Sequence, residues 1–259
     1  MKENNWFDPF YIHDHLTNEE KEIQINVREF CNKELRPQVI KNNREHKFNQ
    51  NLYLRFGSMG ILGQTVKTHG GSGTSNLAYG LVAYELEKID SSYRSAISVQ
   101  SSLVIHPINE FGSEEQKNRF LSDLIEGKKI GCFGLTESEA GSDPSSMKTS
   151  YKKVKDGYIL NGTKNWITNA PIADIFIIWA IEENNNHKSI KGFILEKNFN
   201  GLNISNIENK TSLKISPTGQ IILNNVFVPK NLCLEKTDGW KSVFSCLNKA
   251  RFGISWTNF

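Results

Sequence analysis

The sequence predicts an α+β fold in which a helical first half is followed by a segregated β region. Apolar residues recur at helical spacing up to about residue 130, and short strand-like runs separated by turn residues follow from Gly131. A last helical pattern starts near residue 239. Helices followed by strands are typical of α+β proteins. We therefore expect three parts, residues 1–130, 131–238 and 239–259, the last being the start of a further helical domain.

Capping residues mark the helices expected in the first part. Residues 17–20 (Thr-Asn-Glu-Glu) and 113–116 (Ser-Glu-Glu-Gln) both fit a capping box. Ser75 precedes another helical pattern, and Gly127 suits the residue after a helix C-terminus. Pro37 is expected to close the first helix, because proline removes a backbone donor.

The β region begins with an expected hairpin. Residues 151–154 and 158–160 flank Lys155-Asp156-Gly157, and an Asp-Gly step favours positive φ in a tight turn. The other strand candidates are residues 175–181, 192–196 and 221–228, and helical character returns at residues 242–254.

Composition excludes several classes of function. The formal net charge is only +3 without a basic block, so we expect no nucleic-acid binding. The longest apolar run, residues 175–181, is far shorter than the roughly 20 residues that span a bilayer, so we expect no membrane segment. No metal site is expected, because the cysteines lack zinc-ligand spacing. These cysteines are Cys31, Cys132, Cys233 and Cys246.

Two segments of the β region carry a family resemblance. Residues 131–137 (GCFGLTE) lead into 140–144 (AGSDP), and residues 161–170 (NGTKNWITNA) follow. In this order they resemble the two flavin-contacting signatures of the acyl-CoA dehydrogenase family. The resemblance implies a helical N-terminal domain, a middle β-barrel domain and FAD as cofactor.

Further stretches are similar to the glutaryl-CoA dehydrogenase type. They are residues 93–103, 106–108, 112–116 and 246–254, and the resemblance runs from about Trp6 to Trp256. It implies oxidative decarboxylation of glutaryl-CoA to crotonyl-CoA and CO₂ in lysine and tryptophan degradation. It also implies an electron-transfer flavoprotein as acceptor and a homotetramer, located in the cytoplasm of a bacterium or the mitochondrial matrix of a eukaryote.

The resemblance also implies which residues contact the flavin. The strand that ends at Thr136 would lie along the isoalloxazine ring, and Trp166 would cover the other side with Thr168 near N5. Gly141 and Ser142 would let the backbone approach a phosphate. Alternatively, residues 141–143 form a plain turn and Trp166 is a core aromatic. The expected cofactor residues are Phe133, Leu135, Thr136, Gly141, Ser142, Trp166, Ile167 and Thr168.

Arg94 is expected to bind the far end of the substrate. Glutaryl-CoA carries a free carboxylate there, and burying that charge requires a fixed partner such as an Arg fork. Arg94 and Ser95 match the family positions for this carboxylate, and Glu87 is placed to orient Arg94. The alternative is a surface Arg beside a helix start capped by Ser91.

The last segment supplies the expected acyl-CoA contacts. Arg251 and Asn248 match pocket-lining positions of the family, although a helix-surface Arg is an equal alternative. The remaining expected substrate residues are Phe244 and Leu247 in this segment and Ser142 in the β region.

No catalytic residue is expected within the chain. Residues 257–259 depart from the family pattern, and the family's glutamate base would lie beyond Phe259. We therefore expect a C-terminally truncated and impaired enzyme. An inactive remnant, a non-catalytic flavin or acyl-CoA binding fragment, and a short-chain acyl-CoA dehydrogenase of other specificity are the alternatives.

Overall fold

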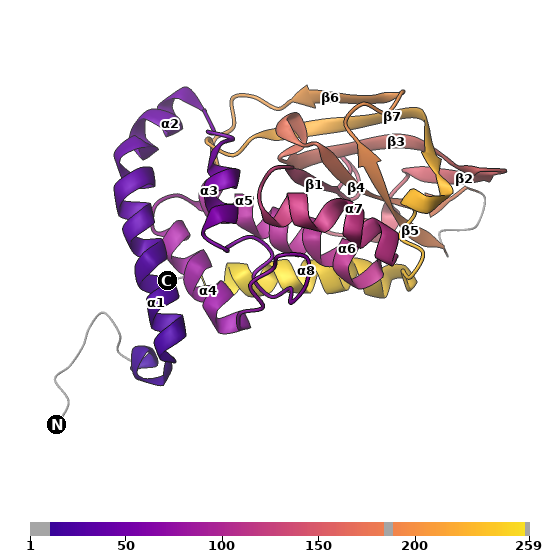
Figure 1. Cartoon of the computed structure of the whole chain (residues 1–259). Coiled ribbons are helices and arrows are strands. Elements are labelled where there is room, and N and C mark those ends of the chain that lie inside the picture. The colour runs from indigo at the N-terminus through magenta and orange to yellow at the C-terminus, as the bar shows by residue number, and fades with distance from the viewer. Residues whose placement is uncertain (1–10, 184–188, 257–259) are drawn as a thin grey trace.

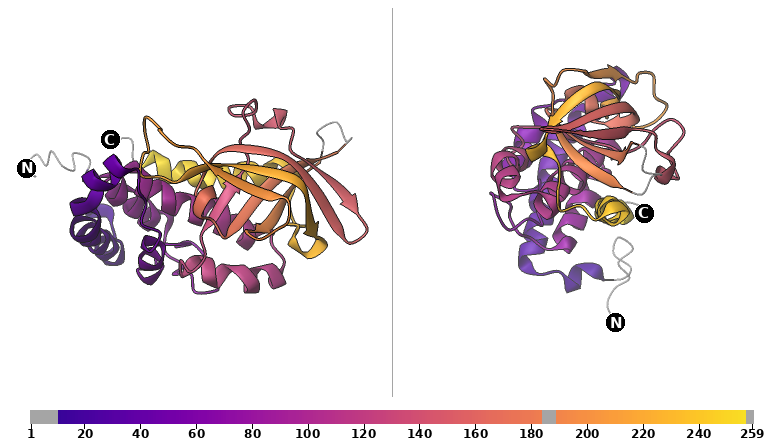
Figure 2. Two further views of the ribbon diagram at one scale, coloured as in Figure 1. Left: turned by 90° about the horizontal axis from the view of Figure 1, so that it is seen from above. Right: turned by 90° about the vertical axis from the view of Figure 1, so that its right-hand side faces the viewer.

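In the computed structural model, which describes residues 11–183 and 189–256, helices occupy one side of the molecule and a curled sheet the other (Figures 1 and 2). Expectations on residues 1–10 and 257–259 fall outside this described part. The α+β class expected from the sequence is confirmed, with one group of helices before the sheet along the chain and the helix Gly239–Ser255 after it.

The first helix begins with the predicted capping box. The Thr17 hydroxyl accepts the Glu20 N–H at 3.2 Å, and the Glu20 carboxylate accepts the Thr17 N–H at 2.9 Å. Pro37 does not end the helical run, so that prediction is wrong. Pro37 lies in the first turn of a 3₁₀ segment, where its missing N–H needs no partner. The run comprises α1 (Asn18–Phe30), a π-helical segment (Cys31–Leu35), a 3₁₀ segment (Arg36–Gln38) and α2 (Val39–Glu45).

The other helices of the first part start at the predicted caps where one was identified. Ser75 accepts the Ala78 N–H at 3.0 Å, and Ser113 accepts the Gln116 N–H at 3.2 Å. Gly127 follows the last of these helices with φ 72°. These elements are α3 (Leu52–Ser58), α4 (Asn76–Glu87), α5 (Ser91–Ser98), a π-helical segment (Val99–Ile105), α6 (His106–Phe111) and α7 (Glu114–Ile125).

The sheet has seven strands. Six are hydrogen-bonded in the order β1-β4-β2-β3-β7-β6, and β5 lies off this path and pairs with β4. Strands β1 and β2 run parallel to β4, and all other pairs are antiparallel. Strands β5 and β6 remain edges, so the sheet curls into an open half-barrel (Figure 2). The strands are β1 (Gly131–Gly134), β2 (Ser150–Val154), β3 (Gly157–Thr168), β4 (Ile175–Glu182), β5 (Ile190–Glu196), β6 (Leu202–Asn206) and β7 (Thr218–Pro229).

The predicted hairpin forms between β2 and β3, but its turn differs from the expected one. Val154 pairs with Gly157, so Lys155 and Asp156 are the two turn residues. Neither they nor Gly157 has positive φ. Gly157 instead lies in β3, where a Cβ would approach the Val228 carbonyl oxygen to 2.2 Å. The glycine is therefore required for close strand packing.

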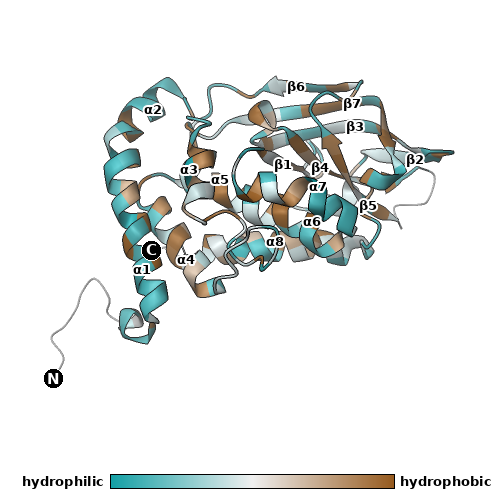
Figure 3. Cartoon of the chain, in the orientation of Figure 1, coloured by the Kyte–Doolittle hydropathy of each residue, from teal (hydrophilic) through white to brown (hydrophobic). Residues whose placement is uncertain are grey.

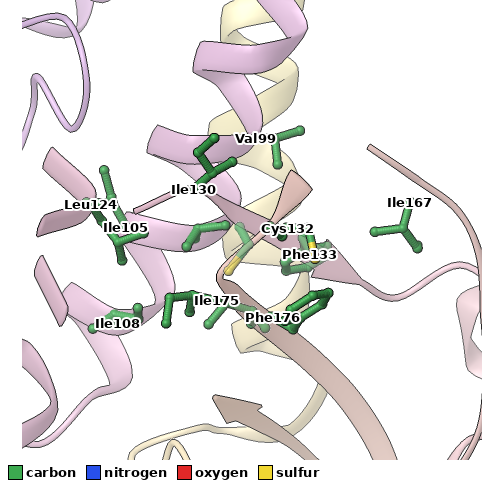
Figure 4. Packing of buried hydrophobic residues seen from close by; sticks show 14 of the residues in the cluster. Val99, Ile105, Ile108, Leu124, Ile130, Cys132, Phe133, Ile167, Ile175 and Phe176 are labelled. Carbon is green, nitrogen blue, oxygen red and sulfur yellow. The ribbon is translucent and has the colours of Figure 1, made fainter. Parts of the chain in front are cut away.

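The helical part and the sheet share one apolar core. Val99, Ile105 and Leu124 from the helices meet Cys132 and Phe176 from β1 and β4 (Figure 4). Figure 3 shows apolar residues gathered along the middle of the molecule, on α3, α5, β4 and β5, whereas α1 and α2 are mostly hydrophilic. No helix in the described part of the chain is both long and apolar enough to cross a bilayer.

Helix α8 (Gly239–Ser255) runs beside the helical part beneath the sheet (Figure 1). It meets α4 closely, because a Cβ on Gly80 would lie 2.4 Å from the Trp256 ring. A Cβ on Gly253 would likewise approach the Tyr79 hydroxyl to 2.8 Å. The C-terminal end of α8 is thereby fixed beside the middle of α4.

Candidate active site

The residues after β1 and the end of β3 form one side of the candidate site. Phe133 and Leu135 are buried, whereas Thr136 is half-buried and lies beyond the end of β1. The expectation that Thr136 belongs to the strand is therefore wrong. The Thr136 carbonyl accepts the Asn165 N–H at 2.8 Å, which joins this loop to β3.

Trp166 lies in a bulge of β3, where the pairing with β7 shifts between Lys164 and Ile167. Its φ is 60° and it is 58% exposed, so it is not a core aromatic. Positive φ is a rare conformation for a bulky residue and is most often retained at functional sites. Asn165 stabilises the bulge, because its Oδ1 accepts the Trp166 N–H and its Nδ2 donates to the Ser138 hydroxyl.

Three hydroxyl groups on these segments are free to bind a ligand. The side chains of Thr136, Ser142 and Thr168 make no hydrogen bond within residues 11–183 and 189–256. A Cβ on Gly141 would meet no atom within 4 Å, so the backbone there is open. Ile167, between Trp166 and Thr168, is buried and anchors the bulge.

The carboxylates of this loop are held by the protein itself. Glu137 accepts a hydrogen bond from the Lys164 Nζ at 2.9 Å, and the Lys164 side chain has 0% exposure. Burial lowers the pKa of Lys164 to about 8, opposed by the charge of Glu137. Burial raises the pKa of Glu137, but Lys164 and hydrogen bonds from Thr149 and Lys148 outweigh it and lower that pKa overall. Asp143 caps the 3₁₀ segment Pro144–Ser146.

Arg94 and Glu87 form the expected pair at the junction of α4 and α5. The Arg94 Nε donates to Glu87 Oε2 at 2.9 Å, and the two side chains are only 13% and 21% exposed. Ser91 donates to the other Glu87 oxygen at 2.5 Å. The terminal Nη atoms of Arg94 have no hydrogen-bond partner among the described residues. The alternative of a surface Arg beside a Ser91 cap is wrong, because Asp90 caps α5.

The expected acyl-CoA residues of the last segment lie on the exposed face of α8. Phe244 is 41% exposed and its ring contacts Trp240, while Leu247 is half-buried. Arg251 is exposed and donates to Asn248 at 3.1 Å. Ser95 is half-buried next to Arg94 in α5. The structure thus leaves polar and apolar groups of α8 available together on one exposed face.

A separate polar cavity of about 510 Å³ lies where α8 meets the start of α4. Lys67, Asn76, His106 and Lys249 are among its lining residues, and it contains none of the residues expected to bind flavin or substrate. Burial lowers the pKa of His106, so this cavity presents a neutral imidazole at pH 7.

Family models match both parts of the chain. Residues 17–128 match the N-terminal domain of acyl-CoA dehydrogenases, and residues 132–226 match their middle domain. The chain belongs to the acyl-CoA dehydrogenase family. The helical domain and the half-barrel of acyl-CoA dehydrogenases are the two regions described above.

Acyl-CoA dehydrogenases of known structure superimpose closely on the chain. A glutaryl-CoA dehydrogenase from Mycobacterium smegmatis in complex with FADH2 is 39% identical with TM-score 0.92, covering 96% of this chain and 63% of that one. Butyryl-CoA dehydrogenase from Megasphaera elsdenii is 34% identical with TM-score 0.88, covering 93% and 65%. Among curated relatives, the short-chain specific acyl-CoA dehydrogenase of Clostridium acetobutylicum is 33% identical, covering 93% of this chain. The chain spans 64% of the length of that relative.

Sequence reasoning missed three residues that shape the site. Lys164 is a charged residue at an inward position of a strand, and this departure from alternation is a usable signal. Asn165 and Gln100 carry no such signal, because their contacts depend on segments distant in the sequence. Gln100 is fully buried and joins the helical part to the Gly131 N–H at 2.8 Å.

Proposed function

We propose that the chain is the flavin- and acyl-CoA-binding part of a glutaryl-CoA dehydrogenase that forms crotonyl-CoA and CO₂. The observation that carries the substrate assignment is the pair of free Nη atoms on Arg94, which is only 13% exposed. An Arg fork that is nearly buried and only partly used is suited to a carboxylate. A plain fatty acyl chain offers it no partner.

The residues around the β3 bulge fit FAD. A flat aromatic ring with a polar edge needs aromatic cover and hydrogen-bond donors, and Trp166 with the hydroxyls of Thr136 and Thr168 supplies both. Gly141 and Ser142 are exposed on the adjacent loop and suit a phosphate. When bound, FAD supplies the hydride-accepting chemistry that no side chain can provide.

The carboxylates of the flavin-side loop are unsuited to remove the substrate α-proton. Glu137 is held by Lys164 and two backbone N–H groups, and Glu139 pairs with Lys148 at 2.6 Å. Asp143 accepts from both Ser145 and Ser146. We therefore assign these groups to loop structure, and propose that the base is a glutamate outside this part of the family fold.

The remaining residues are proposed to bind and orient the acyl-CoA. Glu87 and Ser91 hold the Arg94 guanidinium in place, and Ser95 adds a hydroxyl beside it. The exposed face of α8 supplies Phe244 and Arg251, an apolar and a cationic contact for the pantetheine and phosphate regions. The proposed electron acceptor is an electron-transfer flavoprotein, and the proposed assembly is a homotetramer.

The test compares two acyl-CoA ligands on the FAD-loaded chain. Arg94→Gln should weaken glutaryl-CoA binding about 10- to 100-fold, because it removes charge-assisted hydrogen bonds. Butyryl-CoA binding should change less than threefold, measured by isothermal titration. Equal losses for both ligands would contradict the glutaryl assignment.

A short-chain acyl-CoA dehydrogenase is the second candidate, supported by the likeness to the Clostridium and Megasphaera proteins. Tighter binding of butyryl-CoA than glutaryl-CoA by the wild-type chain would favour it. A non-catalytic binding fragment is the third reading. Bleaching of the flavin absorbance by either acyl-CoA would exclude that reading.

A further inference from the structure

The buried ion pair Lys164–Glu137 joins three segments of the sheet region. The Lys164 Nζ also donates to the Leu135 carbonyl at 3.0 Å and approaches the Met147 sulfur at 3.8 Å. Glu137 accepts the backbone N–H groups that lead into β2, at 2.7 and 2.9 Å. One ion pair therefore connects β3, the loop after β1 and the start of β2.

This connection adjoins both segments proposed to contact the flavin, the Leu135–Thr136 backbone and the Trp166 bulge. Lys164 is the last regularly paired residue of β3 before the bulge that exposes Trp166. Leu135, which accepts from Lys164, immediately precedes Thr136. Two further hydrogen bonds join these segments. Asn165 N–H donates to the Thr136 carbonyl at 2.8 Å, and Asn165 Nδ2 donates to the Ser138 hydroxyl at 3.1 Å.

Stability alone does not account for this pair. Burying two charges carries a desolvation penalty, and apolar side chains of similar size usually stabilise a protein as well or better. Methionine has an unbranched apolar side chain only one atom shorter than that of lysine, so filling this space does not require a lysine. A lysine differs from methionine because its ammonium group donates hydrogen bonds. These bonds hold the Leu135 carbonyl and the Glu137 carboxylate at defined distances from β3.

We propose that Lys164 is a positioning residue for the flavin ring, holding the Leu135–Thr136 backbone and the Trp166 bulge at a spacing that accepts the isoalloxazine. The inference rests on the proposed function, since it requires that the chain bind FAD. Lys164 acts through Leu135 and Glu137, and does not itself touch the ring.

The test measures FAD affinity separately from stability. The flavin-free chain is titrated with FAD at pH 7, following quenching of FAD fluorescence, and each variant is also unfolded in urea. The double variant Lys164→Met/Glu137→Gln removes both charges, and its amide oxygen can still accept one of the N–H groups of Lys148 and Thr149. It should remain folded with a modestly lower urea midpoint, while its FAD dissociation constant rises about tenfold or more.

A matched control lies on the same loop. Lys148→Met breaks the pair with Glu139, in which both side chains are 76% exposed, and should leave the FAD dissociation constant unchanged. The single variant Glu137→Gln is the second test. It should lower the urea midpoint, because Lys164 loses its counter-ion, and in the folded protein before the unfolding transition it should raise the FAD dissociation constant about threefold or more.

The possible outcomes distinguish failure of the Lys164 inference from failure of the proposed function. If the wild-type chain binds FAD and the folded double variant binds it equally well, Lys164 has no positioning role. Should the double variant fail to fold, an unchanged dissociation constant in Glu137→Gln overturns the inference instead. A wild-type chain that does not bind FAD overturns the proposed function, and the inference falls with it.

Discussion

Two ion pairs, one in the sheet and one between α4 and α5, differ in how their hydrogen-bond donors are used. In Lys164–Glu137 the lysine donates to a carboxylate and a carbonyl, and the glutamate accepts from two backbone groups as well. In Arg94–Glu87 the arginine donates only through Nε, and its Nη atoms have no partner in the described part of the chain.

We propose that the difference distinguishes a structural charge from a binding charge. A buried charge with every partner supplied by the protein has no capacity left for a ligand, whereas a partly used guanidinium retains the fork that binds carboxylates. Removing one member of the first pair should therefore damage folding. Removing Arg94 should damage ligand binding instead.

The largest expected effect on stability comes from breaking the Lys164–Glu137 pair. Lys164→Met alone leaves Glu137 buried without its cation, and should lower the free energy of unfolding by about 3–5 kcal/mol. Urea unfolding at pH 7 measures this, with Lys148→Met as the exposed control. A loss below about 1 kcal/mol would contradict the comparison, since exposed pairs contribute that little.

Removal of the Gln100 side chain, whose hydrogen bonds join the helical part to the sheet, should have the next largest effect on stability. Gln100 donates to the carbonyls of Leu124 and Lys129 at 2.9 Å and accepts from Gly131 N–H. Gln100→Leu leaves these groups unpaired and should lower the free energy of unfolding by about 2–3 kcal/mol. Gln38→Leu, at an exposed position, is the control in the same urea experiment, and equal midpoints for the two variants would refute the prediction.

Arg94→Gln is expected to have a small effect on stability. Both members of its pair reach solvent, so the free energy of unfolding should fall by about 1 kcal/mol or less. Thermal unfolding without ligand measures it, and a double-mutant cycle with Glu87→Gln isolates the pair. A loss as large as that of Lys164→Met would mean that Arg94 is a structural charge.

The smallest expected effect is a pH dependence of stability that comes from Glu137. Because the pKa of Glu137 is lowered in the folded state, the carboxylate contributes stability above its unfolded pKa of 4.5. That contribution is lost as pH falls through the folded-state pKa. Between pH 5 and 3 the wild-type urea midpoint should fall more steeply than that of Glu137→Gln, and parallel slopes would contradict this.

Local signals in the sequence predicted much of the fold. The capping residues Thr17, Ser75 and Ser113 act within one helical turn, and each was correctly identified. Strands β4, β5 and β7 were found from apolar runs, whereas the short and mostly exposed β6 was missed. Pro37 was misread, because a change from π- to 3₁₀-helical turns accommodates a proline that an α-helix interior would not.

The candidate site was less predictable, because its geometry depends on contacts distant in sequence. The family resemblance suggested Trp166 and Arg94 by position, but not the bulge that exposes the first or the free Nη atoms of the second. Lys164 and Glu137 are 27 residues apart, and no local pattern pairs them. Only the folded sheet brings them together.

The π-helical segment Val99–Ile105 joins α5 to α6, so its helical turns determine how α5 is rotated about the helix axis relative to α6. An α-helix turns by about 100° per residue, so deletion of one residue here would rotate Arg94 in α5 by about that amount relative to α6. The Arg94 guanidinium would then point in a different direction, although Arg94 and Glu87 were both retained. With Arg94 in its proposed role, insertions and deletions at this point would be a route by which substrate preference diverges within this scaffold.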